Sequence, residues 1–227
     1  NSPFCERITR DLSDPTDPYI TLLDAGFLNR DNEKARGVDV NLNFGDTITI
    51  SGKPFELDID IRGTRVIERS TLFITDSGEE DFNEYQGQWG FAKWKANSYV
   101  TLSWDKYRVL WTTRYTAAVD QNPIGIDPFS DIYDTAGTGF YGDTCQGPAY
   151  GDVTCRDVGF TDDYFVHSLS LTYEEDNYAL TMGARNILDE EPPRVDGNEI
   201  TSKNNAAIGY GYDMSGRTYY LLAAYKF

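Results

Sequence analysis

The chain has 227 residues, enough for one large all-β domain or two small ones, and its formal net charge is −17. This acidity argues against nucleic acid as a partner, because binding it rests on basic side chains. One His and three Cys exclude a histidine-rich metal site. At a mean hydropathy of −0.52, no run approaches the roughly 18 apolar residues of a membrane helix, whereas alternating barrel strands keep the average hydropathy low.

Alternation of apolar and polar residues predicts the first strands. The stretch from about residue 19 to residue 44 is predicted to be one long strand, although a turn near Asn32 would divide it into two. After a short turn at 46–53, a second strand is predicted over 54–74. Its first half has four charges on one face: Glu56, Asp58, Asp60 and Arg62. Such a face suits the solvated side of a sandwich or the wet interior of a wide barrel.

Loops and strands then alternate. The acidic stretch 76–88 is predicted to be a loop and 89–104 a strand. A tight hairpin turn at 105–106 leads into the strand predicted over 107–115. Residues 117–161 show no sustained alternation and are rich in Gly, Pro and Asp. We expect them to form one long loop, which would be extracellular in a barrel.

The C-terminal part of the chain repeats this pattern. Strands are predicted over 165–173 and 178–188, with a short turn at 174–177 between them, and a second long loop covers 189–214. In the last strand one face is apolar: Tyr219, Leu221, Ala223, Tyr225 and Phe227.

Short and long connections therefore alternate along the chain. Transmembrane barrels have short turns on one rim and long loops on the other, and the 14% aromatic content suits their aromatic girdles. We expect an all-β fold, part of an antiparallel transmembrane β-barrel. The pattern predicts seven strands, or eight if the first is divided. Single-chain bacterial barrels have an even number of strands, so we expect the sheet to continue into sequence outside this chain.

Several stretches resemble the C-terminal portion of a TonB-dependent outer-membrane receptor. In that family, Asn-Leu-Phe-Asp followed by Pro-Pro marks the end of the penultimate strand, and 186–193 matches it with Ile187 and Leu188 replacing Leu and Phe. A Tyr-Asp-x-x-Gly-Arg-x-Tyr motif and a terminal aromatic mark the last strand, as in 212–227. The stretches with the resemblance are 4–11, 25–44, 178–195 and 212–227.

The resemblance implies a 22-stranded barrel around an N-terminal plug, of which 1–227 would be the C-terminal barrel part without plug or TonB box. It implies uptake of a scarce ligand across the bacterial outer membrane, with no enzymatic reaction and no cofactor. The implied partners are outer-membrane lipid and lipopolysaccharide, the rest of the receptor, the TonB complex through the missing N-terminal part, and the barrel assembly machinery. We expect the chain to be a fragment or one piece of a split receptor.

Candidate functional residues fall into three groups. For ligand contact we expect aromatic side chains of the 117–161 loop: Phe129, Tyr133, Phe140, Tyr141 and Tyr150. Three arginines are expected to line the lumen and tune its selectivity: Arg62, Arg108 and Arg114. The resemblance implies a role in barrel assembly for the terminal strand, with Tyr219, Tyr225 and Phe227. His167, on an apolar face, is interpreted as an interface residue rather than a functional one.

The cysteines and acidic clusters allow more than one interpretation. A disulfide between Cys145 and Cys155 would close a small loop and stabilise it by roughly 2–3 kcal/mol in an oxidising compartment, and two free thiols are the alternative. Cys5 could pair with a cysteine outside this chain. The acidic clusters at 76–81 and 127–134 could hold surface calcium or bridge lipopolysaccharide through divalent ions, but a solvated loop is the favoured interpretation.

Two other functions stay open. The first is an independent eight-stranded outer-membrane barrel with an adhesin or structural role, which needs a turn near Asn32. The second is a secreted β-sandwich binding module, which would be soluble without detergent. Iron chelates, cobalamin, oligosaccharides and peptides are all compatible ligands for a receptor of this type.

Overall fold

The protein is built from β-strands in antiparallel sheets, as the sequence predicts. The computed structural model describes residues 7–13, 19–24, 32–75, 78–120, 133–134, 155–156, 161–195, 200–203 and 206–226. Among these residues no helix is long and apolar enough to cross a membrane. The chain divides into two compact units, one of Asn1–Arg36 and Glu68–Gln86, the other of Gly37–Ile67 and Gly87–Phe227.

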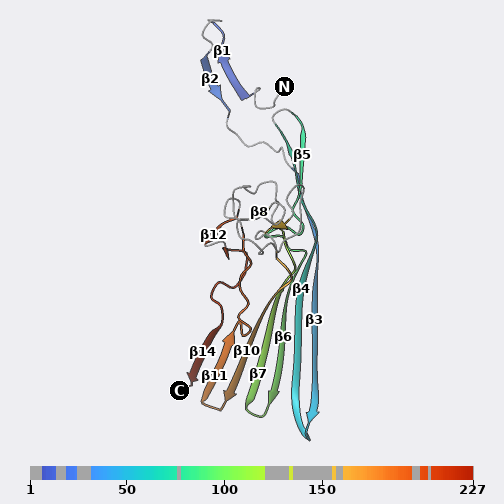
Figure 1. Ribbon diagram of the computed structural model, residues 1–227, viewed down its shortest axis with the longest axis vertical. Helices are drawn as coiled ribbons and strands as arrows, with labels where there is room; N and C mark the ends of the chain where they lie inside the picture. The colour runs from blue at the N-terminus through green and yellow to red at the C-terminus, as the bar shows by residue number, and fades with distance from the viewer. Residues whose placement is uncertain are drawn as a thin grey trace. The chain divides into compact units, whose positions relative to one another are not determined.

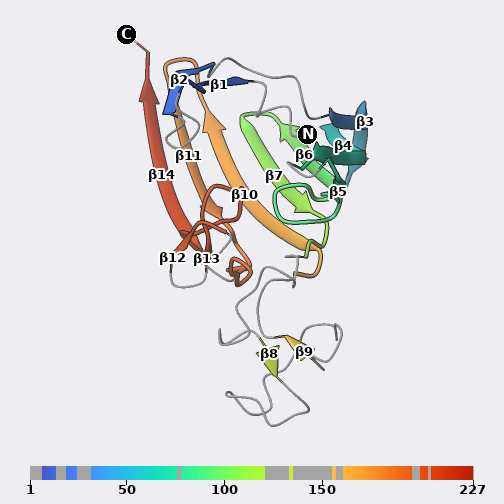
Figure 2. The same ribbon diagram turned by 90° about the horizontal axis from the view of Figure 1, so that it is seen from above.

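The larger unit contains a meandering antiparallel sheet with the strand order β14-β11-β10-β7-β6-β4-β3, which follows a curved surface (Figures 1 and 2). Its strands are β3 (Asn32–Ile50), β4 (Lys53–Ile74), β6 (Trp94–Trp104), β7 (Tyr107–Thr116), β10 (Tyr164–Glu174), β11 (Tyr178–Arg185) and β14 (Thr218–Tyr225). The first residues of β3 and the last residues of β4 belong to the smaller unit. The registers from β4 to β14 contain no shift. Residues therefore alternate cleanly between two faces.

Short turns connect the strands at one end of this sheet. Ser51, Gly52 and Asp105 have positive φ angles of 49°, 78° and 49°, as two-residue hairpin turns require. Lys106 Nζ donates to both carboxylate oxygens of Glu175 at 2.6 Å. This contact joins two neighbouring turns and holds the pKa of Glu175 below its usual range. The predicted turns at 105–106 and 174–177 are confirmed.

Residues typical of turns displace some predicted strand ends. β3 continues to Ile50 and β4 begins at Lys53, so the short turn predicted at 46–53 is confined to Ser51 and Gly52. A Cβ atom at Gly45 would lie 3.1 Å from Asp58 Oδ1, so this glycine permits a close approach to β4 within the sheet. β11 ends at Arg185 and not near residue 188, because Asn186 has a φ angle of 48°.

The prediction of one continuous strand over 19–44 is wrong, and the alternative of two strands divided near Asn32 is the one that forms. β2 (Tyr19–Leu23) pairs with β1 (Ile8–Asp11) in a separate hairpin, and β3 begins only at Asn32. Period-two alternation identifies an extended segment but not the segment with which it pairs, so the pattern could not distinguish these strands.

The rest of the smaller unit corrects a second prediction. Within it, the last part of β4 pairs with β5 (Glu80–Glu84), from Ser70↔Glu84 to Ile74↔Glu80. The stretch 76–88, predicted as a loop, therefore contains a strand. Ion pairs also link β3 to β4 here: Arg36 Nε lies 2.7 Å from Glu68 Oε2, and Arg69 pairs with Glu33.

The two long connections contain short strand pairs. β8 (Tyr133–Asp134) pairs with β9 (Cys155–Arg156) inside the predicted 117–161 loop. β12 (Ser202–Lys203) pairs with β13 (Ala206–Ala207) inside the predicted 189–214 loop.

A small apolar core lies among the connections at the end of the sheet opposite the short turns. Its buried members are Trp89, Ala92, Val119, Val195, Ile200 and Ala207, with Tyr210 and Tyr212 packed against them. The strand predicted from residue 89 begins at Trp94, because Trp89 instead packs against Tyr212 at a ring-centroid distance of 5.3 Å. Burial raises the pKa of Tyr212 to about 12. These connections are thus partly packed and do not all extend freely into solvent.

Candidate functional site

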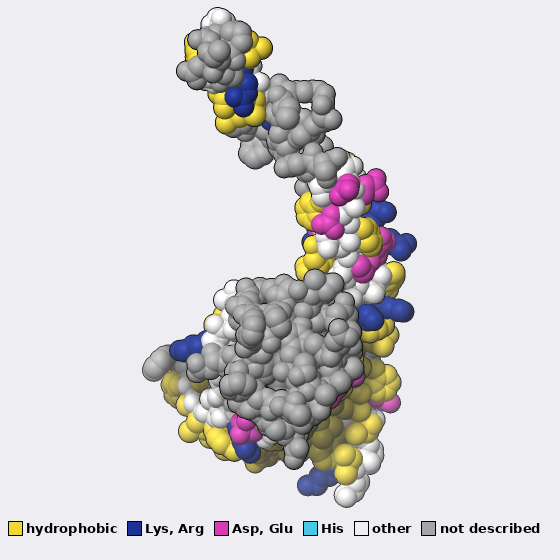
Figure 3. All heavy atoms as spheres, turned by 45° about the horizontal axis from the view of Figure 1, so that its top comes forward, with side chains coloured by type: hydrophobic (Ala, Val, Ile, Leu, Met, Phe, Trp, Pro, Cys, Tyr) yellow, Lys and Arg dark blue, Asp and Glu magenta, His cyan; other side chains and the backbone are white. Residues whose placement is uncertain are grey.

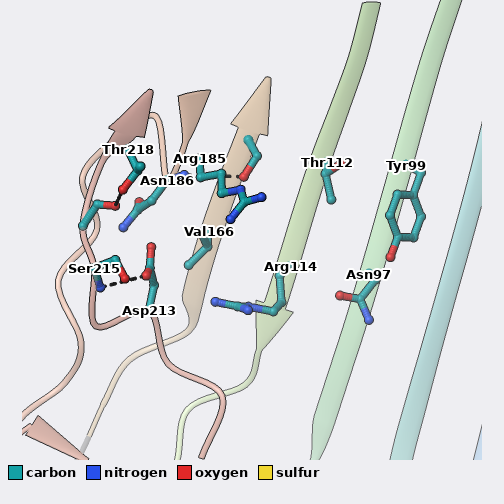
Figure 4. Close-up of a pocket in the computed structure, with 12 residues that line it drawn as sticks. Asn97, Tyr99, Thr112, Arg114, Val166, Arg185, Asn186, Asp213, Ser215 and Thr218 are labelled. Carbon is teal, nitrogen blue, oxygen red and sulfur yellow. Dashed lines mark hydrogen bonds between the residues drawn. The ribbon is translucent and has the colours of Figure 1, made fainter. Parts of the chain in front are cut away.

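The polar face of the larger unit has a hollow of about 430 Å³ near the end of the sheet with the long connections (Figure 4). It is lined by Asn97, Tyr99, Thr112, Arg114, Val166, Ser168, Arg185, Asn186, Asp213, Ser215, Gly216 and Thr218. Most of these side chains are polar, and two are arginines.

Strand register places these residues on one face. Asn97 of β6 lies opposite Arg114 of β7, which lies opposite Val166 of β10. In the next row on the same face, Thr112 of β7 lies opposite Ser168 of β10. Directly opposed residues of antiparallel strands project to the same side. The hollow is therefore a direct consequence of mostly polar residues at every second position of β6, β7 and β10, together with Arg185 of β11.

Arg114 has no partner for its innermost donor. Its Nε is buried without a hydrogen-bond acceptor, and it has no ion pair among the residues that the structure describes. Arg185 also lacks a carboxylate partner there and lies over the ring of Tyr220, 5.4 Å from its centroid. Both guanidinium groups point into the hollow in Figure 4.

One carboxylate, that of Asp213, also lines the hollow. The Ser215 backbone N–H donates to its Oδ1 at 3.0 Å, and the Asp213 N–H donates to the Tyr164 hydroxyl at 3.2 Å. These bonds fix Asp213 in its own loop, and no ion pair joins it to either arginine in the described part of the chain.

The border of the hollow between β11 and β14 is held by the residues of the two C-terminal motifs. Asn186 is fully buried; its Nδ2 donates to the Glu190 carbonyl at 2.9 Å and its Oδ1 accepts from the Glu190 N–H at 2.8 Å. The Asp189 carboxylate accepts from the Arg217 backbone N–H at 2.7 Å and from the Arg217 guanidinium at 3.3 Å. These two Arg217 contacts hold the pKa of Asp189 below its usual range.

The three arginines expected from the sequence all lie on the polar face, but in different situations. Arg62 Nε donates to Asp60 at 2.8 Å, and Arg108 Nη2 lies 3.3 Å from Glu174 Oε2. Only Arg114 of these three lines the hollow. Sequence reasoning missed Arg185. The period-two pattern was sufficient to place it on the same face of β11 as Gly183, two residues earlier.

Most of the expected ligand-contact and disulfide residues lie outside the described residues. This holds for Phe129, Phe140, Tyr141, Tyr150, Cys145 and Cys5, and for Phe227 of the expected assembly group. For Tyr133 and Cys155 only the backbone of β8 and β9 is described. Tyr219 and Tyr225 lie on one face of β14 and are 73% and 63% exposed. Among the described residues, no group of three or more His, Cys, Asp or Glu could hold a metal ion.

The opposite face of the sheet is apolar. Near the short turns it has a row of aromatic rings, in which Phe55–Trp104, Trp104–Tyr107 and Tyr107–Tyr173 have centroid distances of 5.4, 5.4 and 5.1 Å. Aliphatic side chains follow along the strands: Leu57, Ile59, Val100, Leu102, Val109, Leu169, Leu171, Leu180, Met182 and Leu221. In Figure 3, hydrophobic side chains gather over the strands below the grey atoms.

A second group of rings extends from the middle of this face toward its other end. Tyr115 and Phe165 have a centroid distance of 4.8 Å, and His167 lies 5.4 Å from Trp111. Trp111 Nε1 donates to Thr113 Oγ1 at 3.0 Å, and Thr113 Oγ1 lies 2.9 Å from His167 Nδ1. These polar atoms of Trp111, Thr113 and His167 are thus paired with one another, which lowers the cost of removing them from water.

Comparisons with known proteins gave no match: no protein-family model, no curated protein and no solved structure matches the chain.

Proposed function

We propose that this chain is part of an outer-membrane β-barrel of the TonB-dependent receptor type and that it serves ligand uptake without catalysing a reaction. The observation that supports this most is the difference between the two faces of one sheet. One face is apolar, with side chains that are only partly buried or exposed and aromatic rings toward both ends of the strands; the other is polar and contains Arg62, Arg108, Arg114 and Arg185.

The dimensions of the apolar face suit a bilayer. The 10 residues of β7, at about 3.4 Å per residue and a tilt of roughly 40°, would span about 26 Å, close to the apolar band of roughly 25 Å on outer-membrane barrels. Aromatic girdles mark the two interfaces of such barrels. Lipid would then cover Leu102, Val109 and Leu171, and the polar face would line the lumen.

Under this proposal the short turns lie on the periplasmic side and the long connections on the cell surface. The sheet would be completed by other receptor strands around a plug, and the TonB complex would act through that plug. Outer-membrane lipid, lipopolysaccharide and the barrel assembly machinery are the further proposed partners. The identity of the ligand would depend on the surface loops.

The test is an antibody against residues 212–226, applied to fractionated cells after cross-linking in vivo. The proposal predicts that the antigen sediments with outer membranes, migrates far above 25.6 kDa on a denaturing gel and cross-links to TonB. Antigen in the soluble fraction would contradict the membrane assignment. A membrane band near 25.6 kDa without a TonB cross-link would favour an independent small barrel.

A further inference from the structure

We propose that the hollow between Arg114 and Arg185 is a binding site for an oxyanion, a carboxylate or phosphate group on a small polar ligand. The inference rests on the proposed function only in taking the polar face as the lumen wall. The site itself is argued from the contacts of the two arginines.

Five other described arginines in this acidic chain have acidic partners. Arg62 pairs with Asp60, Arg108 with Glu174, Arg217 with Asp189, Arg36 with Glu68 and Arg69 with Glu33. With 37 Asp and Glu against 20 Lys and Arg, a carboxylate partner is readily available. Arg114 and Arg185 have none among the described residues, as is also true of Arg10, Arg65 and Arg194. Arg114 and Arg185 differ from these three because both line the same hollow.

The state of Arg114 adds a second argument. Its Nε is buried and has no acceptor, and leaving a buried charged donor unsatisfied is costly. A guanidinium matches a carboxylate or a phosphate with two parallel N–H···O bonds. An oxyanion in the hollow would supply the missing acceptor.

The remaining lining suits a polar ligand. Thr112, Ser168 and Thr218 bring hydroxyl groups and Asn97 an amide, all of which can hydrogen-bond to oxygen atoms of a ligand. Asp213 is held by Ser215 in its own loop and disfavours ligands that place a negative charge on that side. A volume of about 430 Å³ lies within the usual range of roughly 300–1,000 Å³ for small-molecule sites.

The experiment is a titration of the purified protein in detergent micelles with succinate and with inorganic phosphate, followed by the ¹H–¹⁵N signals of arginine Nε–H groups. The proposal predicts saturable binding of at least one anion, with a shift of the Arg114 signal. The neutral amide succinamide should bind at least tenfold more weakly. Stronger binding of succinate assigns a carboxylate ligand, and stronger binding of phosphate assigns a phosphate ligand.

Variants distinguish binding at this site from a general attraction of anions to positively charged side chains. Arg114→Gln and Arg185→Gln should each weaken binding at least tenfold. Arg114→Lys should also weaken it, because lysine keeps the positive charge but lacks the two parallel N–H donors of a guanidinium. Arg65→Gln is the matched control, because Arg65 lies on the opposite face over Trp94. Tryptophan emission of each variant checks that it is folded.

Three results would overturn the proposal: no saturable binding of either anion, equal binding of succinamide, or equal weakening by Arg65→Gln. Failure of the membrane assignment is a separate outcome. A soluble protein that binds succinate through Arg114 would keep the site and refute the proposed function.

Discussion

The carboxylate of Asp189 accepts two hydrogen bonds from Arg217, one from the backbone N–H at 2.7 Å and one from the guanidinium at 3.3 Å. Asp189 follows β11 and Arg217 precedes β14, so this pair fixes the beginning of the last strand against the end of its sheet neighbour. Gly216 belongs to the same arrangement: its φ angle is 66°, and a Cβ atom there would lie 3.1 Å from Asp189 Oδ1.

Asp189→Asn should lower the stability of the β11–β14 pair, because it removes the negative charge that accepts from Arg217. The measurement is the denaturant midpoint in detergent, read by tryptophan emission. Asp162→Asn is the control, since Asp162 is exposed and the Thr161 hydroxyl donates to its backbone carbonyl, not to its carboxylate. An equal midpoint for the two variants would contradict the structural role of Asp189.

The contribution of Asp189 should depend on pH. Its pKa is lowered in the folded protein, so its stabilisation is complete above the ordinary carboxyl pKa of about 3.9 and is lost as the pH falls through the lower folded value. The stability difference between the wild type and Asp189→Asn should therefore be constant at neutral pH and shrink below about pH 4. Denaturant titrations at a series of pH values measure this difference, and a difference that grows on acidification would contradict the assignment.

Gly183→Ala should destabilise the sheet. A Cβ atom at Gly183 would lie 2.6 Å from Tyr220 Cζ and 2.8 Å from the Leu169 carbonyl oxygen, and overpacking of this kind typically costs about 1–3 kcal/mol. At Gly63, by contrast, a Cβ atom would meet its nearest neighbours at 3.6 Å. Gly63→Ala should therefore change the free energy of unfolding much less, and similar losses in both variants would show that Tyr220 does not restrict position 183.

Single-tryptophan variants should show depth-dependent quenching by brominated lipids. Trp104 lies in the aromatic row near the short turns, and Trp111 lies near the middle of β7. We expect the strongest quenching of Trp104 by bromine close to the headgroups and of Trp111 by bromine deeper in the acyl chains. Trp89, which is 6% exposed within the loop core, is the internal control. Quenching of Trp89 equal to that of Trp111 would contradict the orientation of the apolar face.

Residue alternation was sufficient to predict the main strands and their faces. Leu57, Leu102 and Leu171 lie on the apolar side because antiparallel register keeps opposed residues on one side of the sheet. The turn at 105–106 was predictable for a related reason: two polar residues separate two alternating runs.

Contacts between segments distant in sequence could not be predicted in this way. The hairpin of β1 with β2 and the pairing of β5 with β4 depend on which extended segments meet. Periodicity does not predict which segments these are. The hydrogen bonds between Asp189 and Arg217 join two motifs to which the family resemblance gave no structural role. Arg185 was missed because its significance depends on lining the same hollow as Arg114, which lies on β7 with one strand, β10, between them.

The most direct test of the central claim is a spin-label scan along β10 in lipid bilayers, with one cysteine at a time from Phe165 to Tyr173. Our account predicts period-two alternation in accessibility. Oxygen, which concentrates in lipid, should reach labels at Leu169 and Leu171, and a water-soluble nickel chelate should reach labels at Ser168 and Ser170. Uniform access of the chelate to both sets would contradict a sheet with one face in lipid and the other in a polar lumen.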